Sequence, residues 1–127
     1  MKLRAIVADD NSRVLHEIVS LLRKEFDVVA TASDGGSARE CIQRHTPDVA
    51  VLDLVMPNIN GIELTRELTR NGSSTKVIIC SIEEDRETVE EAFRAGAMGY
   101  VFKPRIARDL IAAVKSVAEG HCFTSAA

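Results

Sequence analysis

The stretch Val49-Ala50-Val51-Leu52-Asp53 is a short apolar run, partly β-branched, that ends directly in an acid. Similar runs recur along the chain, at residues 3–8, 27–31, 49–52, 76–80 and 99–102. A strand that is buried on both faces lacks the alternation of polar and apolar residues that marks a half-exposed strand. The runs therefore predict five buried, parallel strands.

Stretches with helical spacing of apolar residues separate these runs, and their boundaries carry helix signals. Asp34 and Asn60 are expected N-caps, and Gly96 can adopt the left-handed conformation that ends a helix. The order of strand and helix, repeated about five times, is typical of an α/β fold. We expect a doubly wound, five-stranded parallel sheet with helices on both faces and a flavodoxin-like strand order.

Length and charge limit the classes of function. The chain has 127 residues, of which 46% are hydrophobic, and this length fits one compact domain. With 16 basic and 19 acidic residues the formal net charge is −3, so no general attraction to nucleic acid or to a membrane is expected. Residues 1–119 are expected to form the domain, and residues 120–127 a C-terminal tail or the start of a linker.

Targeting signals and cysteine pairing are not indicated. The apolar run at the N-terminus is too short for a secretory signal, and no later run is long enough to span a membrane, which predicts a cytoplasmic protein. Cys41, Cys80 and Cys122 are odd in number and widely spaced, so reduced thiols are expected rather than disulfides or structural zinc.

Polar residues with related chemistry follow four of the predicted strands. Asp9 and Asp10 follow the first, Asp53 ends the third, Ser81 follows the fourth and Lys103 follows the fifth. In sheets of this type ligands bind beyond the carboxyl ends of the strands. We therefore expect these side chains to form one site at that edge.

Three carboxylates at one edge would repel each other unless a cation compensates them. Oxygen ligands favour Mg²⁺, with Mn²⁺ as a substitute, and Lys103 adds a positive charge that can pair with Asp53 or with a phosphoryl oxygen. Each residue also has a structural interpretation: Asp9 and Asp10 as helix caps, and the others as turn or loop residues. Only their conjunction indicates a site.

The same residues resemble the receiver domains of response regulators, the CheY-like family. The resemblance rests on an acidic pair after the first strand, Asp-x-x-Met-Pro after the third, a Ser after the fourth and Lys-Pro after the fifth. In this sequence these are Asp9-Asp10, Asp53-Leu54-Val55-Met56-Pro57, Ser81 and Lys103-Pro104. The stretch at residues 95–104 is most similar to receivers that precede a LuxR-type helix-turn-helix domain.

The resemblance implies a regulatory phosphoacceptor that is not an enzyme but has self-phosphorylation and dephosphorylation chemistry. Asp53 would accept the phosphoryl group from a sensor histidine kinase. Mg²⁺ would be held by Asp10 and Asp53, by Asp9 through water, and by the backbone carbonyl of Val55. Lys103 and Ser81 would contact the phosphoryl oxygens.

The resemblance also implies a switch, in which Ser81 moves inward and an aromatic residue on the fifth strand, Tyr100, fills the vacated space. The alternative for Tyr100 is a half-buried aromatic residue with its hydroxyl group in water. The switched surface would act on a partner, either a second copy in a homodimer or an output domain. DNA would be bound only through an output domain that is absent from this chain.

Alternative functions remain open at this point. Ile82 replaces the small residue usual after the Ser in this family, which raises the possibility of a pseudo-receiver that works without phosphorylation. A stand-alone phosphorelay receiver is another possibility. A flavodoxin-like cofactor protein would share the fold, but the sequence contains neither G-x-G-x-x-G nor a Walker motif.

Overall fold

Parallel strands form one sheet in the computed structural model, which describes residues 2–125. The strands run in the order β2-β1-β3-β4-β5-β6, and every neighbouring pair is parallel. Their bounds are Arg4–Ala8 (β1), Asp27–Ala32 (β2), Val49–Asp53 (β3), Lys76–Ser81 (β4), Gly99–Phe102 (β5) and Phe123–Thr124 (β6). The expected flavodoxin-like order of the first five strands is confirmed.

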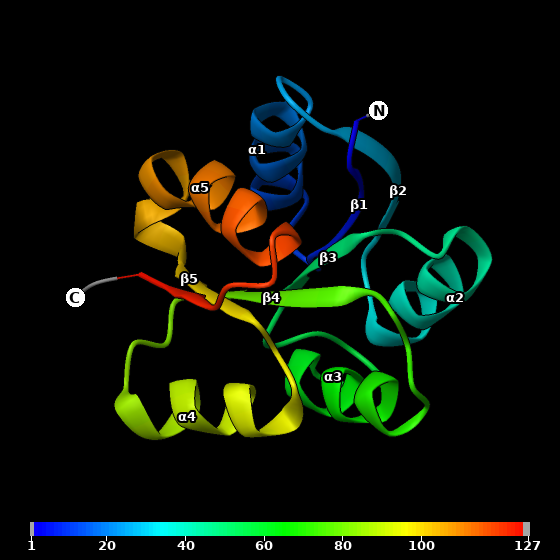
Figure 1. Ribbon diagram of the computed structural model, residues 1–127, viewed down its shortest axis with the longest axis vertical. Coiled ribbons are helices and arrows are strands. Elements are labelled where there is room, and N and C mark those ends of the chain that lie inside the picture. The colour runs from blue at the N-terminus through cyan, green and yellow to red at the C-terminus, as the bar shows by residue number, and fades with distance from the viewer. Residues whose placement is uncertain (1, 126–127) are drawn as a thin grey trace.

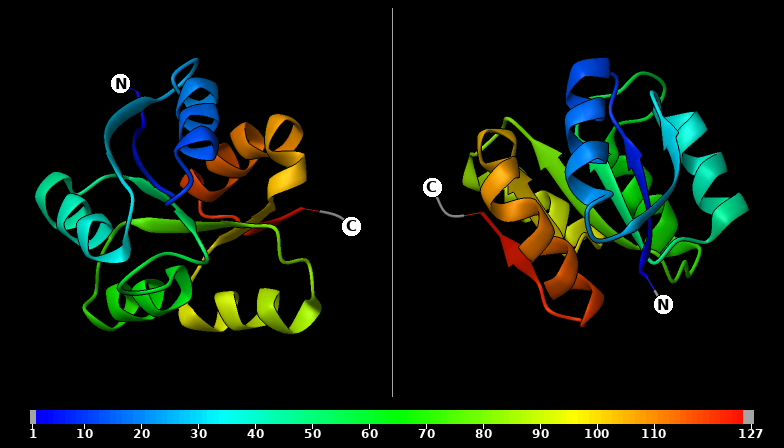
Figure 2. Two further views of the ribbon diagram at one scale, coloured as in Figure 1. Left: turned by 180° about the vertical axis from the view of Figure 1, so that it is seen from behind. Right: turned by 90° about the horizontal axis from the view of Figure 1, so that it is seen from above.

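Helices cover both faces of the sheet, as Figures 1 and 2 show. α1 and α5 lie on one face, and α2, α3 and α4 lie on the other. The helices are Ser12–Leu22 (α1), Gly35–His45 (α2), Gly61–Arg70 (α3), Arg86–Ala95 (α4) and Ile106–Ala118 (α5), with a short 3₁₀ turn, η1, at Lys103–Arg105. This arrangement is the expected doubly wound fold.

Two hydrophobic cores, one on each side of the sheet, explain why the strands lack polar alternation. Ile6 and Leu52 face the core beneath α2, α3 and α4, whereas Val7 and Val51 face the core beneath α1 and α5. All four are fully buried. Because successive strand residues point to opposite faces, burial on both sides requires apolar residues at every position.

Helix caps follow the sequence signals. Asp34 accepts a hydrogen bond from the Ser37 N–H, Asn60 accepts one from the Glu63 N–H, and Gly96 ends α4 with a φ of 116°. The N-cap of α1 is Asn11, not Asp9 or Asp10. The capping interpretation of these two acids is therefore wrong, although Asp9 Oδ1 does accept a hydrogen bond from the Asn11 N–H at 2.8 Å just before the helix.

The C-terminal segment differs from the expected tail. Phe123 and Thr124 form β6 and pair with Gly99 and Tyr100 of β5, so the sheet has a sixth strand beyond the five expected. A two-residue strand produces no readable periodicity in the sequence, and it forms here because β5 would otherwise be an edge with unpaired backbone groups. Residues 126 and 127 of the proposed tail lie outside the described residues.

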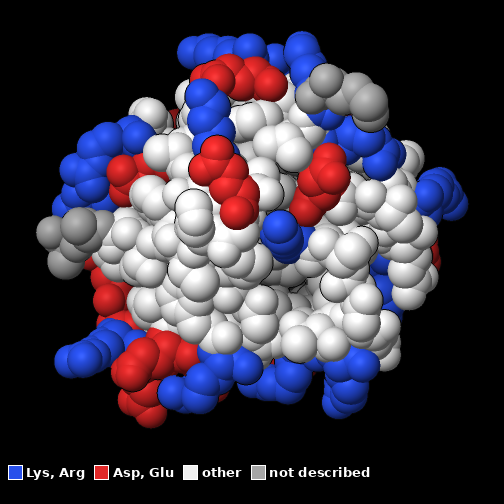
Figure 3. Space-filling model, viewed as in Figure 1, with Lys and Arg blue, Asp and Glu red and all other residues white. Residues whose placement is uncertain are grey.

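The helices, the cysteines and the surface charge of the described chain bear on the remaining expectations from the sequence. Among residues 2–125 no helix combines the length and apolar character needed to cross a membrane. The three cysteines are free, as expected. Figure 3 shows basic and acidic side chains near the upper centre of one face as well as around its margin, with uncharged residues over much of the rest. This face carries no large area of a single charge.

Candidate functional site

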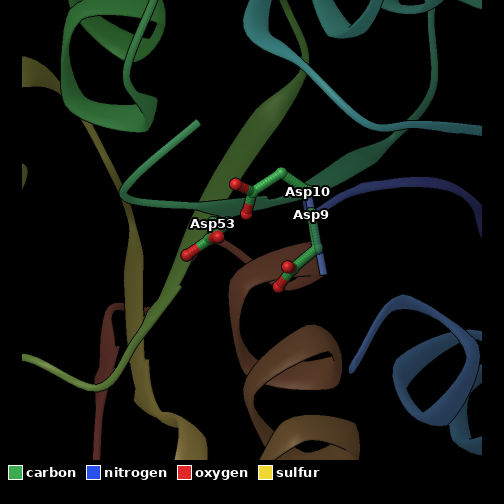
Figure 4. Close-up of side chains that lie close together, drawn as sticks. All are labelled: Asp9, Asp10 and Asp53. Atoms are coloured by element: carbon green, nitrogen blue, oxygen red, sulfur yellow. The ribbon is translucent and has the colours of Figure 1, made fainter. Parts of the chain in front are cut away.

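Three carboxylates converge where β1 and β3 end. Asp9 and Asp10 follow β1 and Asp53 is the last residue of β3, and Figure 4 shows their side chains gathered together. One ligand atom from each lies within 4.8 Å of the others. Asp9 and Asp53 are only 1% and 6% exposed, whereas Asp10 is open to solvent. The expected clustering of these acids is confirmed.

Lys103 reaches this cluster from the residue after β5. Its Nζ lies 2.9 Å from Asp9 Oδ2 and 3.1 Å from Asp53 Oδ1. The sequence led us to expect a pairing with Asp53 alone. In the folded protein the ammonium group lies between two buried carboxylates and compensates part of the charge of both.

The protonation equilibria reflect this crowding. Burial, followed by the negative charge of Asp9, raises the pKa of Asp53 from 3.8 to about 6, although Lys103 opposes the change. Burial disfavours the charged form of Lys103, but the adjacent carboxylates of Asp9 and Asp53 outweigh it and raise the pKa of the lysine. One lysine therefore does not compensate the acidic cluster completely.

One feature of the cluster fits a divalent cation. Asp9 Oδ2 is fully buried, and although Lys103 Nζ is close enough for an ion pair, no hydrogen bond with acceptable geometry reaches this oxygen from the described residues. A buried carboxylate oxygen without such a partner is costly. Carboxylate oxygens are the ligands that Mg²⁺ prefers, so the donor set and its excess negative charge fit this ion.

A hollow of 410 Å³ opens above Asp53. It is lined by Asp10, Asn11, Val14, Asp53, Val55, Ser81, Ile82, Glu83 and Lys103. Four of the five residues found at strand ends in the sequence therefore border one space, and Asp9 lies buried beneath it. Val55 and Ile82 also line the hollow but are 68% and 71% exposed, so both lie at its rim.

Ser81 and Tyr100 are connected through the loop after β4. Ser81 Oγ accepts a hydrogen bond from the Glu83 N–H at 3.0 Å, and the Tyr100 hydroxyl donates to the Glu83 carbonyl at 2.8 Å. Tyr100 is fully buried, and burial raises its pKa. The alternative of a half-buried tyrosine with its hydroxyl in water is therefore wrong.

Two residues that position the site were not singled out in the sequence. Asn11 caps α1 and lines the hollow, and its place directly before an apolar helical stretch was a readable N-cap signal. Gly61 begins α3, and a Cβ atom there would collide with the backbone carbonyl of Asp53. No sequence signal indicated this close approach between α3 and β3.

Comparison with known proteins agrees with this geometry. Residues 5–115 match the family described as the response regulator receiver domain. A relative is the transcriptional regulatory protein DegU of Brevibacillus brevis, 36% identical over 124 residues that cover 96% of this chain and 52% of DegU. The chain spans about half the length of the curated relatives it matches.

Solved structures give the same result. The signal receiver domain of the response regulator NarL from Mycobacterium tuberculosis superposes with a TM-score of 0.91 at 31% identity, covering 94% of this chain and 98% of that one. A LuxR-family two-component response regulator from Aurantimonas sp. SI85-9A1 gives a TM-score of 0.91 at 30% identity, with 97% and 89% covered. On its sequence, its fold and its acidic site, the chain belongs to the response regulator receiver domain family.

Proposed function

We propose that this receiver domain accepts a phosphoryl group on Asp53 and that Mg²⁺ is required for the reaction. The observation that carries the proposal is the position of Lys103, whose Nζ lies 2.9 Å from Asp9 and 3.1 Å from Asp53 beside a third carboxylate. This arrangement combines a nucleophile, a cation site and a mobile positive charge in one hollow. Phosphoryl transfer depends mainly on such positioning and charge compensation.

The reaction begins with ionised Asp53, the dominant form above its pKa of about 6. A carboxylate oxygen forms a bond to phosphorus as the bond between phosphorus and the donor breaks, and the electron pair of that bond leaves with the donor. Asp53 then carries an acyl phosphate, whose phosphoryl group bears roughly −1.5 to −2 charges in place of the single charge of the carboxylate. Lys103 can turn from the carboxylates to a phosphoryl oxygen, and Ser81 can donate its hydroxyl to another.

The metal ligands follow from the same residues. Asp10, Asp53 and Asp9 would hold Mg²⁺ together with the backbone carbonyl of Val55, which borders the hollow. When bound, the ion neutralises charge on the phosphoryl oxygens. The chain itself contributes the burial of Asp9 and Asp53, which makes a cation favourable at this place.

The switch would involve Ser81 and Tyr100. Both side chains bind to Glu83, so movement of Ser81 toward a phosphoryl oxygen would disturb the loop that holds the tyrosine hydroxyl. A local change of charge can shift an element between two arrangements. We propose that the altered surface contacts a partner. The two candidate partners are a second domain that binds DNA and a second copy of this chain in a homodimer.

The phosphodonor would be the phosphohistidine of a sensor histidine kinase, in the cytoplasm. Membership of the receiver domain family supports this proposal, since receiver domains interact with such kinases. The relatives that are about twice as long and are named as transcriptional regulators support an output in gene control. A stand-alone relay is the competing arrangement, and the full natural gene product would distinguish the two.

The experiment is labelling with acetyl phosphate, followed by intact mass measurement. We expect one phosphoryl group per chain in the presence of Mg²⁺, and none in EDTA or in Asp53→Asn. The matched control is Asp27→Asn, which changes an exposed acid at the start of β2 in the same way. Equal labelling of Asp53→Asn and the wild type would contradict the proposal.

A pseudo-receiver is the second candidate, and Ile82 is the residue that favours it. This side chain stands at the rim of the hollow and is 71% exposed. It would restrict a bulky donor more than a small one. If acetyl phosphate and Mg²⁺ do not label the wild type but do label Ile82→Ala, Ile82 blocks phosphoryl transfer and the wild type is a pseudo-receiver; labelling of the wild type would exclude this candidate.

A further inference from the structure

The residue after the C-terminal strand β6, Ser125, continues the hydrogen bonds of the sheet through its backbone N–H and its side chain. Ser125 directly follows β6 and is only 4% exposed. Its backbone N–H donates to the Tyr100 carbonyl at 2.9 Å. Its Oγ accepts from the Phe102 N–H at 3.1 Å, in the place where a longer β6 would offer a carbonyl.

The same hydroxyl also reaches α5. Ser125 Oγ donates to Asp109 Oδ2 at 2.8 Å, and Asp109 is 8% exposed. The pKa of Asp109 is lowered, chiefly because Arg108 donates hydrogen bonds to its carboxylate. Burial acts in the opposite direction, and the hydrogen bond from Ser125 lowers the pKa further. The carboxylate is therefore ionised near neutral pH and is a strong acceptor for the Ser125 hydroxyl.

These two bonds bracket the segment that carries Lys103. Phe102 immediately precedes the lysine, and Asp109 lies in the first turn of the helix that follows it. Between them lies only the short turn η1 and the beginning of α5. One buried oxygen atom thus fixes both ends of the peptide from which Lys103 reaches Asp9 and Asp53.

We propose that Ser125 is a positioning residue for Lys103, and that β6 is thereby coupled to the phosphorylation site. The proposal rests on the proposed function, in which Lys103 contacts the phosphoryl group. Coupling of this kind is reciprocal. A change in the contacts of Lys103 on phosphorylation is therefore transmitted to Ser125, and the loss of Ser125 loosens Lys103.

The test uses Ser125→Ala with Thr124→Val as its matched control. Both substitutions remove one hydroxyl group from consecutive residues, but Thr124 is exposed and no hydrogen bond of its hydroxyl is found among the described residues. In Ser125→Ala we expect phosphorylation by acetyl phosphate at saturating Mg²⁺ to slow about tenfold at saturating donor, with half-saturation unchanged. Thr124→Val should react like the wild type, and Ser125→Thr should recover most of the rate.

A double-mutant cycle distinguishes positioning from general destabilisation. If Ser125 acts through Lys103, then Ser125→Ala causes no further loss of rate in a Lys103→Met background. The proposal would be overturned if the rate of the double variant were reduced by the product of the two factors by which the single substitutions reduce it. If Ser125→Ala does not fold, Ser125→Cys, which keeps a weakly hydrogen-bonding atom, replaces it in the same cycle.

A second measurement is independent of phosphoryl transfer. We expect the Phe102 amide proton to exchange at least tenfold faster in Ser125→Ala than in Thr124→Val, and the Lys103 amide resonance to shift only in the former. If the wild type accepts no phosphoryl group, the proposed function fails and these spectra still test the positioning. Wild-type exchange and an unshifted Lys103 resonance in Ser125→Ala would overturn it.

Discussion

Replacing Asp53 with asparagine is expected to stabilise the folded protein near neutral pH, although it removes the proposed phosphoacceptor. The pKa of this carboxyl is about 6 in the folded protein, compared with an ordinary value of 3.8, because burial and the charge of Asp9 disfavour ionisation. Each pKa unit corresponds to about 1.4 kcal/mol. Ionised Asp53 therefore costs the folded state at most about 3 kcal/mol at a pH well above its pKa.

The direction of the pH dependence follows from the same change. Because the folded protein holds the Asp53 proton more tightly than the unfolded chain does, the contribution of Asp53 to the free energy of unfolding falls as pH rises from 3.8 to about 6. Asparagine has a similar shape and no proton to lose. The difference in free energy of unfolding between Asp53→Asn and the wild type should thus be small near pH 3.8. It should reach its full size above a pH of about 6.

The assay is urea denaturation followed by far-ultraviolet circular dichroism, because the chain contains no tryptophan. EDTA is present throughout, so that bound divalent ions do not contribute. Asp27→Asn, which alters an exposed acid, should match the wild type at each pH. The reasoning is refuted if Asp53→Asn is less stable than the wild type above the pKa, or if its gain in stability is the same at every pH.

Three further changes test other parts of the site. Lys103→Met should slow labelling by acetyl phosphate about 10- to 100-fold, since a hydrogen bond to a charged group contributes about 1.5–3 kcal/mol; an unchanged rate would exclude contact with the phosphoryl group. Mg²⁺ at a hundred times its Kd should raise the free energy of unfolding of the wild type by about 2.7 kcal/mol, and the same concentration should stabilise Asp10→Asn less in parallel denaturation curves. Gly61→Ala should lower that free energy by about 1–3 kcal/mol, because its Cβ would collide with the Asp53 carbonyl, whereas Gly36→Ala, whose Cβ would make only ordinary contacts, should be tolerated; equal stability of the two variants would contradict the close approach.

Much of the fold could be predicted because its signals are local. The apolar runs gave the five main strands, and Asp34 and Asn60 were readable as caps from their own type and position. The convergence of Asp53 and Lys103 followed from one topological rule, that ligands bind beyond the carboxyl ends of such strands. These inferences needed no knowledge of side-chain direction.

The parts that could not be predicted depend on distant contacts. Consecutive residues at a strand end point in opposite directions, but only the fold shows that Asp9 is the buried member of its pair and shares Lys103 with Asp53. β6 is too short to produce a pattern, and Ser125 is important only because Phe102 and Asp109 approach it. Such contacts join residues that carry no recognisable spacing.

The central claim is that Asp53 itself becomes the acyl phosphate, and reduction by borohydride tests it most directly. Borohydride converts an aspartyl phosphate into homoserine, which peptide mass spectrometry locates in the sequence. After treatment with acetyl phosphate and Mg²⁺, we expect homoserine at position 53 and aspartate at positions 9 and 10. Homoserine at another position, or intact aspartate at position 53 in a chain that carries one phosphoryl group, would contradict the account.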